Sequence, residues 1–155
     1  MNQLTALPEN SLITVFGGTG FLGRHIIRRL SKAGYRLRVA TRRPNEALFL
    51  KTNGKPGQIE LVQANIRDAA SVAHALEGAD GVVNAVGILF ESGKQKFEAV
   101  QARGAALIAD AAAKAEITHM VHISAIGADA ESASSYAKSK AIGEAAVRQL
   151  VPQAH

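Results

Sequence analysis

Residues 15–24, Val-Phe-Gly-Gly-Thr-Gly-Phe-Leu-Gly-Arg, decide the fold of this chain. Before the glycines, residues 12–16 form a short β-branched and aromatic run that is typical of a buried strand. After them, apolar residues recur at helical spacing up to a stop signal at Gly34: Phe21, Leu22, Ile26, Ile27 and Leu30. The sequence therefore predicts a turn with three glycines, spaced GxxGxxG, between a strand and a helix.

The three glycines have separate roles, and together they point to a nucleotide. Gly17 allows the tight turn, Gly20 lets the backbone approach a pyrophosphate, and Gly23 lets the helix lie close to the strand. Free N–H groups of the first helical turn then face the phosphates. A glycine turn that binds nothing is the alternative, but the flanking strand and helix favour nucleotide binding. We expect the whole turn to contact the cofactor: Gly17, Gly18, Thr19, Gly20, Phe21, Leu22 and Gly23.

Composition excludes several classes of protein. With 155 residues, 47% of them hydrophobic, the chain can form one domain with a substantial core. The absence of cysteine excludes disulfides and thiolate metal sites and favours a reducing, cytoplasmic location. The five histidines lack metal-ligand spacing, so no metal is expected. No apolar run approaches the about 20 residues of a membrane span, and residues 1–10 do not resemble a signal peptide.

The net charge of +5 does not by itself indicate nucleic-acid binding. The basic residues are scattered, no aromatic residues lie between them, and the chain has no Trp. Nucleic-acid binding would favour a basic stripe with stacking side chains. We interpret the charge as a solvated helix face together with a phosphate-binding cluster.

The rest of the chain alternates strands and helices. Further strands are expected over residues 36–41, 59–64, 81–86 and 119–124, and helices over 46–51, 68–76, 96–114 and from Ser134 or Ser135 to 150. With right-handed crossovers, this alternation predicts an α/β fold, a doubly wound parallel sheet of order 3-2-1-4-5. A complete dinucleotide-binding fold adds at least a sixth strand, and residues 151–155 would lead into it. We therefore expect residues 1–155 to be one cofactor-binding domain, the N-terminal part of a longer protein.

Two arginines after the second strand bear on the choice of cofactor. Many NAD-binding chains place an acidic residue at this strand end to accept the ribose hydroxyls. Here Thr41 has that position, and Arg42 and Arg43 follow it. Guanidinium groups suit a 2′-phosphate, so we favour NADP(H), with NAD(H) as the other candidate. Solvated arginines before a proline turn would be the structural alternative.

Two further segments are expected to line the cofactor site. Asn65 and Ile66 follow the third strand, where the adenine ring should lie, whereas Asp68 is better explained as a helix cap. The fourth strand ends at the crevice where the strand order reverses, with Ala85, Val86 and Gly87. A glycine there lets the backbone approach the middle of the cofactor, although a plain turn glycine is an equally good interpretation.

Three polar residues near the fifth strand suggest proton transfer. Ser124 ends the strand, Tyr136 lies twelve residues on, and Lys140 follows four residues after Tyr136. Positions i and i+4 share one helix face, and a lysine cation beside a phenol favours the phenolate. Such a tyrosine can exchange a proton with a carbonyl oxygen while a hydride moves, and the serine can hydrogen-bond the same oxygen. Most isolated Tyr-xxx-Lys pairs lie on surfaces, but the serine and the neighbouring nucleotide site make this pattern more specific.

These residues together resemble the short-chain dehydrogenase/reductase superfamily, in its extended or atypical branch of NAD-dependent epimerase/dehydratase type. Residues 17–23 match the fingerprint of that branch, and Glu144 belongs to a Gly-Glu pair often found after its active-site triad. The resemblance implies a Rossmann fold. It also implies that Ser124, Tyr136 and Lys140 are catalytic, and that Tyr136 and Lys140 contact the cofactor.

A narrower resemblance involves residues 83–91 and 122–128. They are similar to bacterial relatives of the Rossmann-type accessory subunit of respiratory complex I, a family that holds NADPH tightly for structure rather than turnover. Mitochondrial members of that family stray from the catalytic pattern, whereas this chain keeps all three catalytic-type residues. The resemblance therefore leaves the activity of this chain open.

Two functions remain in competition, with a redox sensor that binds NADP as a weaker third. The first is an NADP-dependent reductase, epimerase or dehydratase acting on an unknown small molecule. The alternative is a non-catalytic NADPH-holding accessory or assembly subunit of respiratory complex I, peripheral to the inner membrane through a protein partner. The last two helices are expected to support a homodimer or a contact with such a partner.

Overall fold

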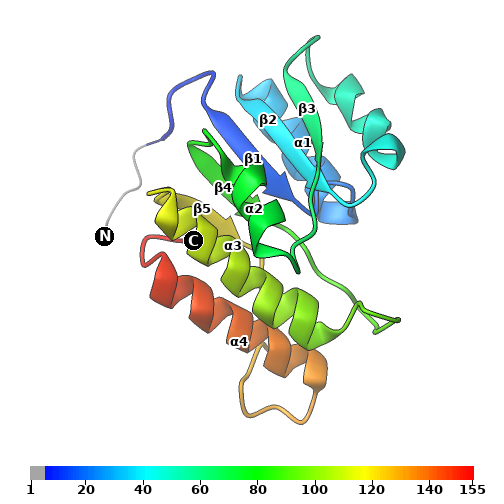
Figure 1. Ribbon diagram of the computed structural model, residues 1–155, viewed down its shortest axis with the longest axis vertical. Helices are drawn as coiled ribbons and strands as arrows, with labels where there is room; N and C mark the ends of the chain where they lie inside the picture. Colours follow the sequence, from blue (N-terminus) through cyan, green and yellow to red (C-terminus); the bar gives the residue numbers. More distant parts are fainter. Residues whose placement is uncertain (1–5) are drawn as a thin grey trace.

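The computed structural model describes residues 6–155 and contains one parallel sheet with helices on both faces (Figure 1). The sheet order is β3-β2-β1-β4-β5, which confirms the predicted topology. The strands are β1 (Leu12–Phe16), β2 (Arg36–Thr41), β3 (Ile59–Gln63), β4 (Gly81–Asn84) and β5 (His119–His122). All five begin at the predicted residue, but β3, β4 and β5 end one or two residues earlier than predicted.

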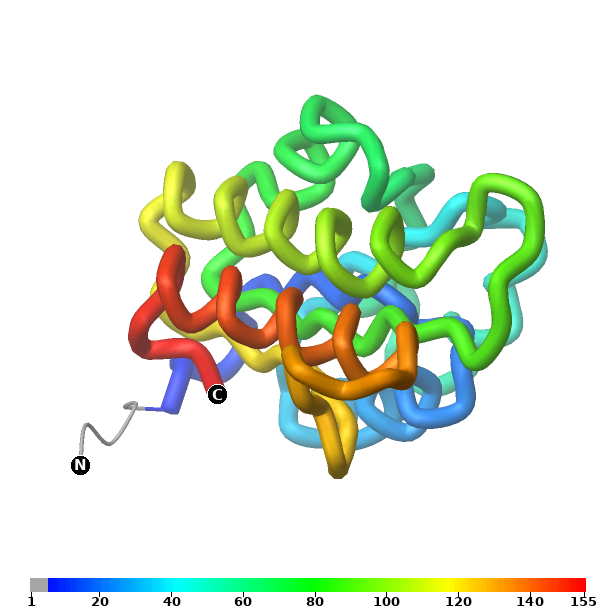
Figure 2. The backbone as a smooth tube through the Cα atoms, turned by 90° about the horizontal axis from the view of Figure 1, so that it is seen from below, coloured from blue at the N-terminus to red at the C-terminus, as the bar shows by residue number. Residues whose placement is uncertain are grey.

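Helices α1 (Phe21–Lys32) and η1 (Pro44–Asn53) cover one face of the sheet, and the remaining helices cover the other. On the first face, Ile27 of α1 and Leu50 of η1 pack against Val15 and Val39 of the central strands. On the second face lie α2 (Ala69–Leu76), η2 (Glu98–Arg103), α3 (Gly104–Lys114) and α4 (Ser135–Leu150). Helices α3 and α4 run side by side, as Figures 1 and 2 show.

Two predicted helices have a different geometry in the structure. The expected helix over 46–51 is a 3₁₀ helix over Pro44–Asn53. Pro44 occupies its first position, and the side chains of Thr52 and Asn53 bond to carbonyls three residues back at its end. The expected helix over 96–114 begins as a π-helical segment, Glu98–Arg103, and becomes α-helical at Gly104. Periodicity predicted the helix but could not reveal its wider first turns.

Local capping signals in the sequence are confirmed. The Asp68 carboxylate accepts a hydrogen bond from the backbone N–H of Ala70 and caps α2. The Ser134 hydroxyl accepts from the N–H of Ala137 and caps α4. These caps fix the starting points of α2 and α4.

The last residue of the chain pairs with β5. The backbone N–H of His155 donates to Met120 at 2.9 Å, and the His155 carbonyl accepts from His122 N–H at 2.7 Å. This pattern is that of a parallel ladder, in which one residue bonds to both neighbours of its partner. The edge of β5 is therefore partly paired by residue 155.

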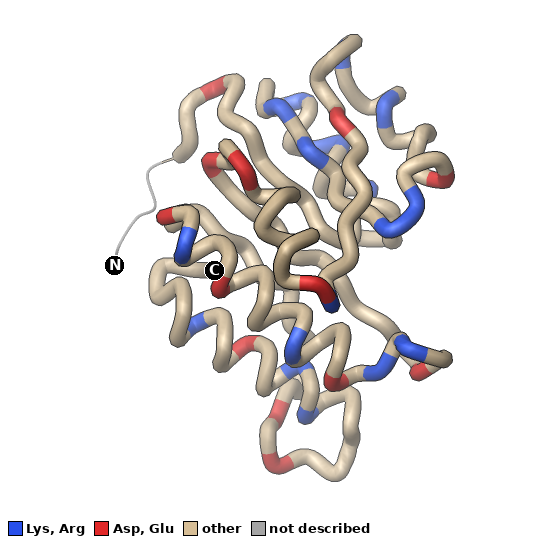
Figure 3. The backbone as a smooth tube through the Cα atoms, viewed as in Figure 1, with Lys and Arg blue, Asp and Glu red and all other residues tan. Residues whose placement is uncertain are grey.

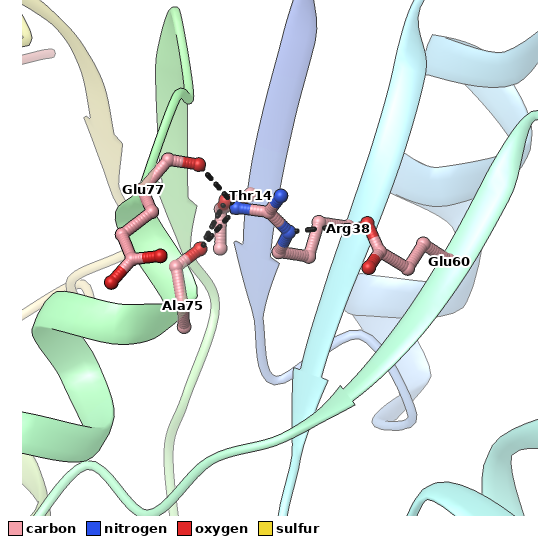
Figure 4. A network of polar contacts seen from close by, with 5 residues as sticks. All are labelled: Thr14, Arg38, Glu60, Ala75 and Glu77. Carbon is pink, nitrogen blue, oxygen red and sulfur yellow. Dashed lines mark hydrogen bonds and ion pairs between the residues drawn. The ribbon is translucent and has the colours of Figure 1, made fainter.

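A polar row crosses the sheet beneath the end of α2 (Figure 4). Thr14, Arg38 and Glu60 stand in register on β1, β2 and β3. The Arg38 Nη1 donates to the carbonyls of Ala75 at 3.2 Å and Glu77 at 2.6 Å, and Nε pairs with Glu60 at 3.2 Å. Because the last carbonyls of a helix lack intrahelical partners, the guanidinium caps α2 and ties it to the sheet.

We expect Arg38→Met to lower the free energy of unfolding by about 2–3 kcal/mol, because it removes charged hydrogen bonds to two helix-end carbonyls. Glu60→Gln is the matched control, because the Glu60 side chain is 56% exposed and its ion pair should contribute less than about 1 kcal/mol. Urea unfolding monitored by circular dichroism measures both. Equal losses in the two variants would contradict the capping role of Arg38.

Candidate nucleotide-binding site

A cleft of about 530 Å³ lies at the carboxyl ends of the central strands. Four segments contribute predicted residues to its lining: Gly17, Thr19 and Gly20; Arg42 and Arg43; Asn65 and Ile66; Ala85, Val86 and Gly87. The structure thus brings together residues that the sequence placed after β1, β2, β3 and β4. This is the edge where open α/β sheets bind ligands.

The glycine turn after β1 has the geometry that its spacing predicts. Gly17 has φ +79°, and a Cβ built on it would lie 2.6 Å from the carbonyl carbon of Ala85. A Cβ on Gly23 would collide with the carbonyl oxygen of Gly17. Neither position can carry a side chain, so the start of α1 lies directly against the turn.

Gly20 differs from these two because it faces the cleft. Its φ is −72°, which any residue adopts, and the nearest atom to a built Cβ would be the Gly17 carbonyl oxygen at 3.4 Å. The protein itself therefore has room for a side chain at Gly20. Keeping this position bare leaves space for a group of the ligand at the start of α1.

The remaining residues of the turn do not line the cleft. Gly18 is buried, with its α-carbon against Ile27 and Val39, so it serves packing. Phe21 and Leu22 lie on the first turn of α1 and are exposed. Their predicted contact with the cofactor stays a prediction.

Arginines surround the mouth of the cleft, and Figure 3 shows basic segments after β2 and in the loop after β4. Arg43 forms an exposed ion pair with Glu46 at 3.2 Å. With the Gln95 amide oxygen turned toward it, Arg42 donates to that oxygen at 2.7 and 3.1 Å. The Gln95 contact brings the loop after β4 across to the end of β2.

A third arginine, Arg24, was missed by the sequence analysis. It lines the same cleft, donates to the carbonyls of Thr19 at 3.1 Å and Gly20 at 3.3 Å, and stacks over the Phe49 ring at 5.5 Å. These contacts hold its guanidinium beside the glycine turn. Its position directly after Gly23, at the start of the helix, was the available signal in the sequence.

The loop after β4 is held both by the neighbouring strand β1, whose Phe16 carbonyl accepts from the N–H of Ala85 at 2.9 Å, and by side chains. The N–H of Val86 donates to Asn84 Oδ1 at 3.1 Å, and the N–H of Ile88 donates to Gln101 Oε1 at 3.1 Å. Between them, a Cβ built on Gly87 would lie 3.9 Å from Lys140 Nζ. The loop that lines the cleft therefore borders the lysine of α4.

The three predicted catalytic residues lie just after β5 and in the first two turns of α4. Lys140 is buried, and its Nζ donates to the Ile123 carbonyl at 2.8 Å, directly before Ser124. Burial lowers the pKa of Lys140, and the Glu144 carboxylate partly opposes this shift. The Ser124 hydroxyl is buried and makes no hydrogen bond within residues 6–155. Tyr136 lies one helical turn before Lys140, with its ring edge-to-face against Phe97 at 5.8 Å.

His122 on β5 forms a second polar contact beneath this region. The Asn84 Nδ2 donates to His122 Nδ1 at 3.1 Å, an orientation fixed because Asn84 Oδ1 accepts from Val86. Burial and the neighbouring Lys140 cation lower the pKa of His122 to about 4, although Glu144 opposes the shift. A neutral His122 with an accepting Nδ1 is therefore the form present at neutral pH.

No group of three or more His, Cys, Asp or Glu side chains is placed to hold a metal ion within residues 6–155. No helix among these residues is long and apolar enough to cross a bilayer.

Comparison with known proteins agrees with the geometry of the cleft. A protein-family profile described as NAD(P)H-binding matches residues 17–152. The chain belongs to this NAD(P)H-binding family. Its fold is a Rossmann fold, as the resemblance implied, but the match does not distinguish NADP from NAD.

Two curated relatives and one solved structure illustrate the family. The chain is 33% identical over 140 residues to the mitochondrial NADH-ubiquinone oxidoreductase 40 kDa subunit of Neurospora crassa, covering 90% of this chain and 37% of the relative. It is 31% identical over 149 residues to a ceramide reductase of Caulobacter vibrioides, covering 96% and 45%. A Bacillus halodurans structure assigned to the NAD-dependent epimerase/dehydratases has a TM-score of 0.78 at 22% identity, covering 90% and 65%. The chain spans less than half the length of both curated relatives.

We expect Gly20→Val to abolish NADPH binding while the protein stays folded, with a free energy of unfolding within about 1 kcal/mol of the original. The valine side chain would fill the cleft without meeting the protein core. Gly23→Ala is the contrasting variant and should unfold the protein, because its methyl group would collide with the Gly17 carbonyl. Fluorescence titration with NADPH and thermal unfolding measure these effects. Unchanged NADPH affinity in Gly20→Val would overturn the site assignment.

Proposed function

We propose that this chain is the NADP(H)-binding domain of an extended or atypical short-chain dehydrogenase/reductase with Ser-Tyr-Lys chemistry. One observation carries the proposal: the cleft that joins the glycine turn to the arginines after β2 also reaches Gly87, which borders Lys140. A dinucleotide lying along such a cleft would extend from the arginines to the start of α4. The substrate would be a small molecule whose reacting carbon lies beside Ser124 and Tyr136.

The charges of the cleft favour NADP(H) over NAD(H). Arg24, Arg42 and Arg43 all line it, whereas Glu46 is the one acidic residue in the described lining and is paired with Arg43. No carboxylate therefore stands at the end of β2 to accept ribose hydroxyls. Guanidinium groups bind phosphate oxygens through charge-assisted hydrogen bonds, which suits a 2′-phosphate.

The proposed chemistry divides among three side chains. NADP(H), when bound, supplies or accepts the hydride. Tyr136 would exchange a proton with the substrate oxygen, and Ser124, whose buried hydroxyl has no partner within residues 6–155, would donate a hydrogen bond to the same oxygen. Lys140 would keep the start of α4, and with it Tyr136, next to Ser124. Its Nζ bonds the Ile123 carbonyl, and it lies one helical turn after Tyr136.

The second candidate is a cofactor-holding accessory or assembly subunit of respiratory complex I. The observation that favours it is the 33% identity to the Neurospora subunit, which spans nearly the whole of this chain. In this role the same cleft would hold NADP(H) without turnover. The partner would be the respiratory complex, and the protein would lie at the membrane periphery through that partner.

We also propose that residues 1–155 are the N-terminal cofactor-binding part of a longer protein. The parallel pairing of His155 with β5 supports a sixth strand beginning at this residue. Both curated relatives are more than twice as long as the part that this chain matches, which agrees with a longer protein. A homodimer contact through α3 and α4 stays a prediction.

We expect the double variant Arg42→Ala/Arg43→Ala to bind NADPH at least about tenfold more weakly, with NADH affinity little changed. Each guanidinium–phosphate bond contributes about 1.5–3 kcal/mol, and only NADPH carries the 2′-phosphate. Arg28→Ala/Arg36→Ala removes the same net charge from exposed residues outside the cleft and serves as control. Titrations with both cofactors test this, and equal losses for NADPH and NADH would refute the 2′-phosphate role.

We expect Tyr136→Phe, made in the longer protein, to lower NADPH oxidation by about 10²-fold or more while NADPH affinity stays within about twofold. The phenol would supply the proton, whereas the arginines and the glycine turn would supply the binding. Absorbance of NADPH with a panel of aldehydes and ketones measures the rate. If the protein retains NADPH but Tyr136→Phe alters no rate, the accessory-subunit candidate replaces the enzyme.

A further inference from the structure

The π-helical segment η2 carries a buried amide that is bonded at both ends. Gln101 is only 2% exposed, and its Oε1 accepts the N–H of Ile88 at 3.1 Å. Its Nε2 donates to Ser139 Oγ at 2.9 Å, and that hydroxyl donates to the Tyr136 carbonyl at 2.8 Å. Three hydrogen bonds therefore connect the loop after β4 to the first turn of α4.

The local backbone brings this amide into the interior. The π geometry buries three consecutive residues, Val100, Gln101 and Ala102. On the neighbouring helix, the α-carbon of Gly143 packs so closely on the Gln101 carbonyl that a Cβ there would collide with it. Single π turns inside helices are frequent at functional sites, because they displace one side chain from the regular helical face.

The bonds of Gln101 connect the two halves of the candidate site. Ile88 follows Gly87, and a Cβ built on Gly87 would lie 3.6 Å from Gln101 Oε1. Tyr136 is the residue proposed to exchange the proton. A buried apolar side chain would fill the same space without the cost of burying an amide. It would not, however, fix the direction of the Ile88 N–H or, through Ser139, of the Tyr136 carbonyl.

We propose that Gln101 is a positioning residue that sets the placement of Tyr136 relative to the cofactor loop, residues 85–88. It acts through Ser139 on one side and through the N–H of Ile88 on the other. The inference rests on the proposed function, because it assigns to Gln101 the alignment of the phenol with the bound nicotinamide.

The sequence offers a direct spectroscopic readout of this alignment. The chain has two tyrosines, so tyrosine labelled with ¹³C only at the hydroxyl-bearing ring carbon gives one signal per residue, and Tyr35→Phe assigns them. Tyr35 lies away from the cleft, with its hydroxyl bonded to the Leu7 carbonyl. In the original protein, NADPH should shift the Tyr136 signal and leave the Tyr35 signal in place.

Gln101→Met removes both polar ends at similar volume, and Ser139→Ala removes only the connection to α4. We expect both variants to reduce the NADPH-induced shift of Tyr136 by at least about half. NADPH affinity should fall about three- to tenfold in Gln101→Met, which also frees Ile88, and less than about twofold in Ser139→Ala. Ile108→Val is the control for lost stability, because Ile108 is fully buried in α3 but takes no part in these bonds. It should leave the Tyr136 response unchanged.

An unchanged Tyr136 response in both Gln101→Met and Ser139→Ala would overturn the proposal, as would an equal loss in Ile108→Val. The proposed function fails separately if the original protein does not bind NADPH. In that case the Tyr136 signal is compared between the original protein and each variant, all without cofactor. A shifted or broadened signal in Gln101→Met and Ser139→Ala, but not in Ile108→Val, would still support the positioning role. Identical signals in all variants would remove it.

Discussion

The close approach of α1 to the turn after β1 is the constraint on which the site depends. Because Gly23 has no side chain, the first turn of the helix lies against the Gly17 carbonyl. Because Gly17 also has no side chain, the same turn lies against the backbone of Ala85 in the loop after β4. One short turn thus fixes the helix start and the loop, and it directs the N-terminal end of the α1 dipole toward the cleft.

Two of the basic side chains that line the cleft already contact other residues, but these contacts are weak. Arg43 pairs with an exposed Glu46, and Arg42 bonds to the neutral Gln95 amide. Exposed ion pairs contribute little, so an anionic ligand could replace these contacts at small cost. Arg24 differs, because its two carbonyl bonds and its stacking on Phe49 orient it without neutralising it. The cleft is therefore an electropositive site that is largely preformed.

The parts of this structure that the sequence predicted are those governed by local rules. The glycine turn and the caps at Asp68 and Ser134 depend on residues close together in the chain, and the strand order follows from the alternation of strands and helices with right-handed crossovers; the structure agrees with all of them. The π turn of η2 and the bonds of Gln101 were missed because they depend on contacts with residues 88 and 139. Arg24 differs, because its carbonyl partners Thr19 and Gly20 are close in the sequence, and only its contact with the Phe49 ring depends on a residue far along the chain.

The loop over residues 85–88 is held from two sides, and both sides lead to α4. On one side, Asn84 bonds Val86 and the neutral ring of His122, which lies beside Lys140. On the other, Gln101 bonds Ile88 and reaches Tyr136 through Ser139. Since both routes use directional hydrogen bonds between buried groups, the loop and the first turns of α4 should move as one unit. Any role that needs the loop to hold a dinucleotide therefore also keeps the tyrosine and lysine in place. The Ser139 bond engages the Tyr136 carbonyl and not its phenol, so it would hold the backbone of α4 equally in a cofactor-holding subunit and in an enzyme, and only an enzyme would need the phenol itself.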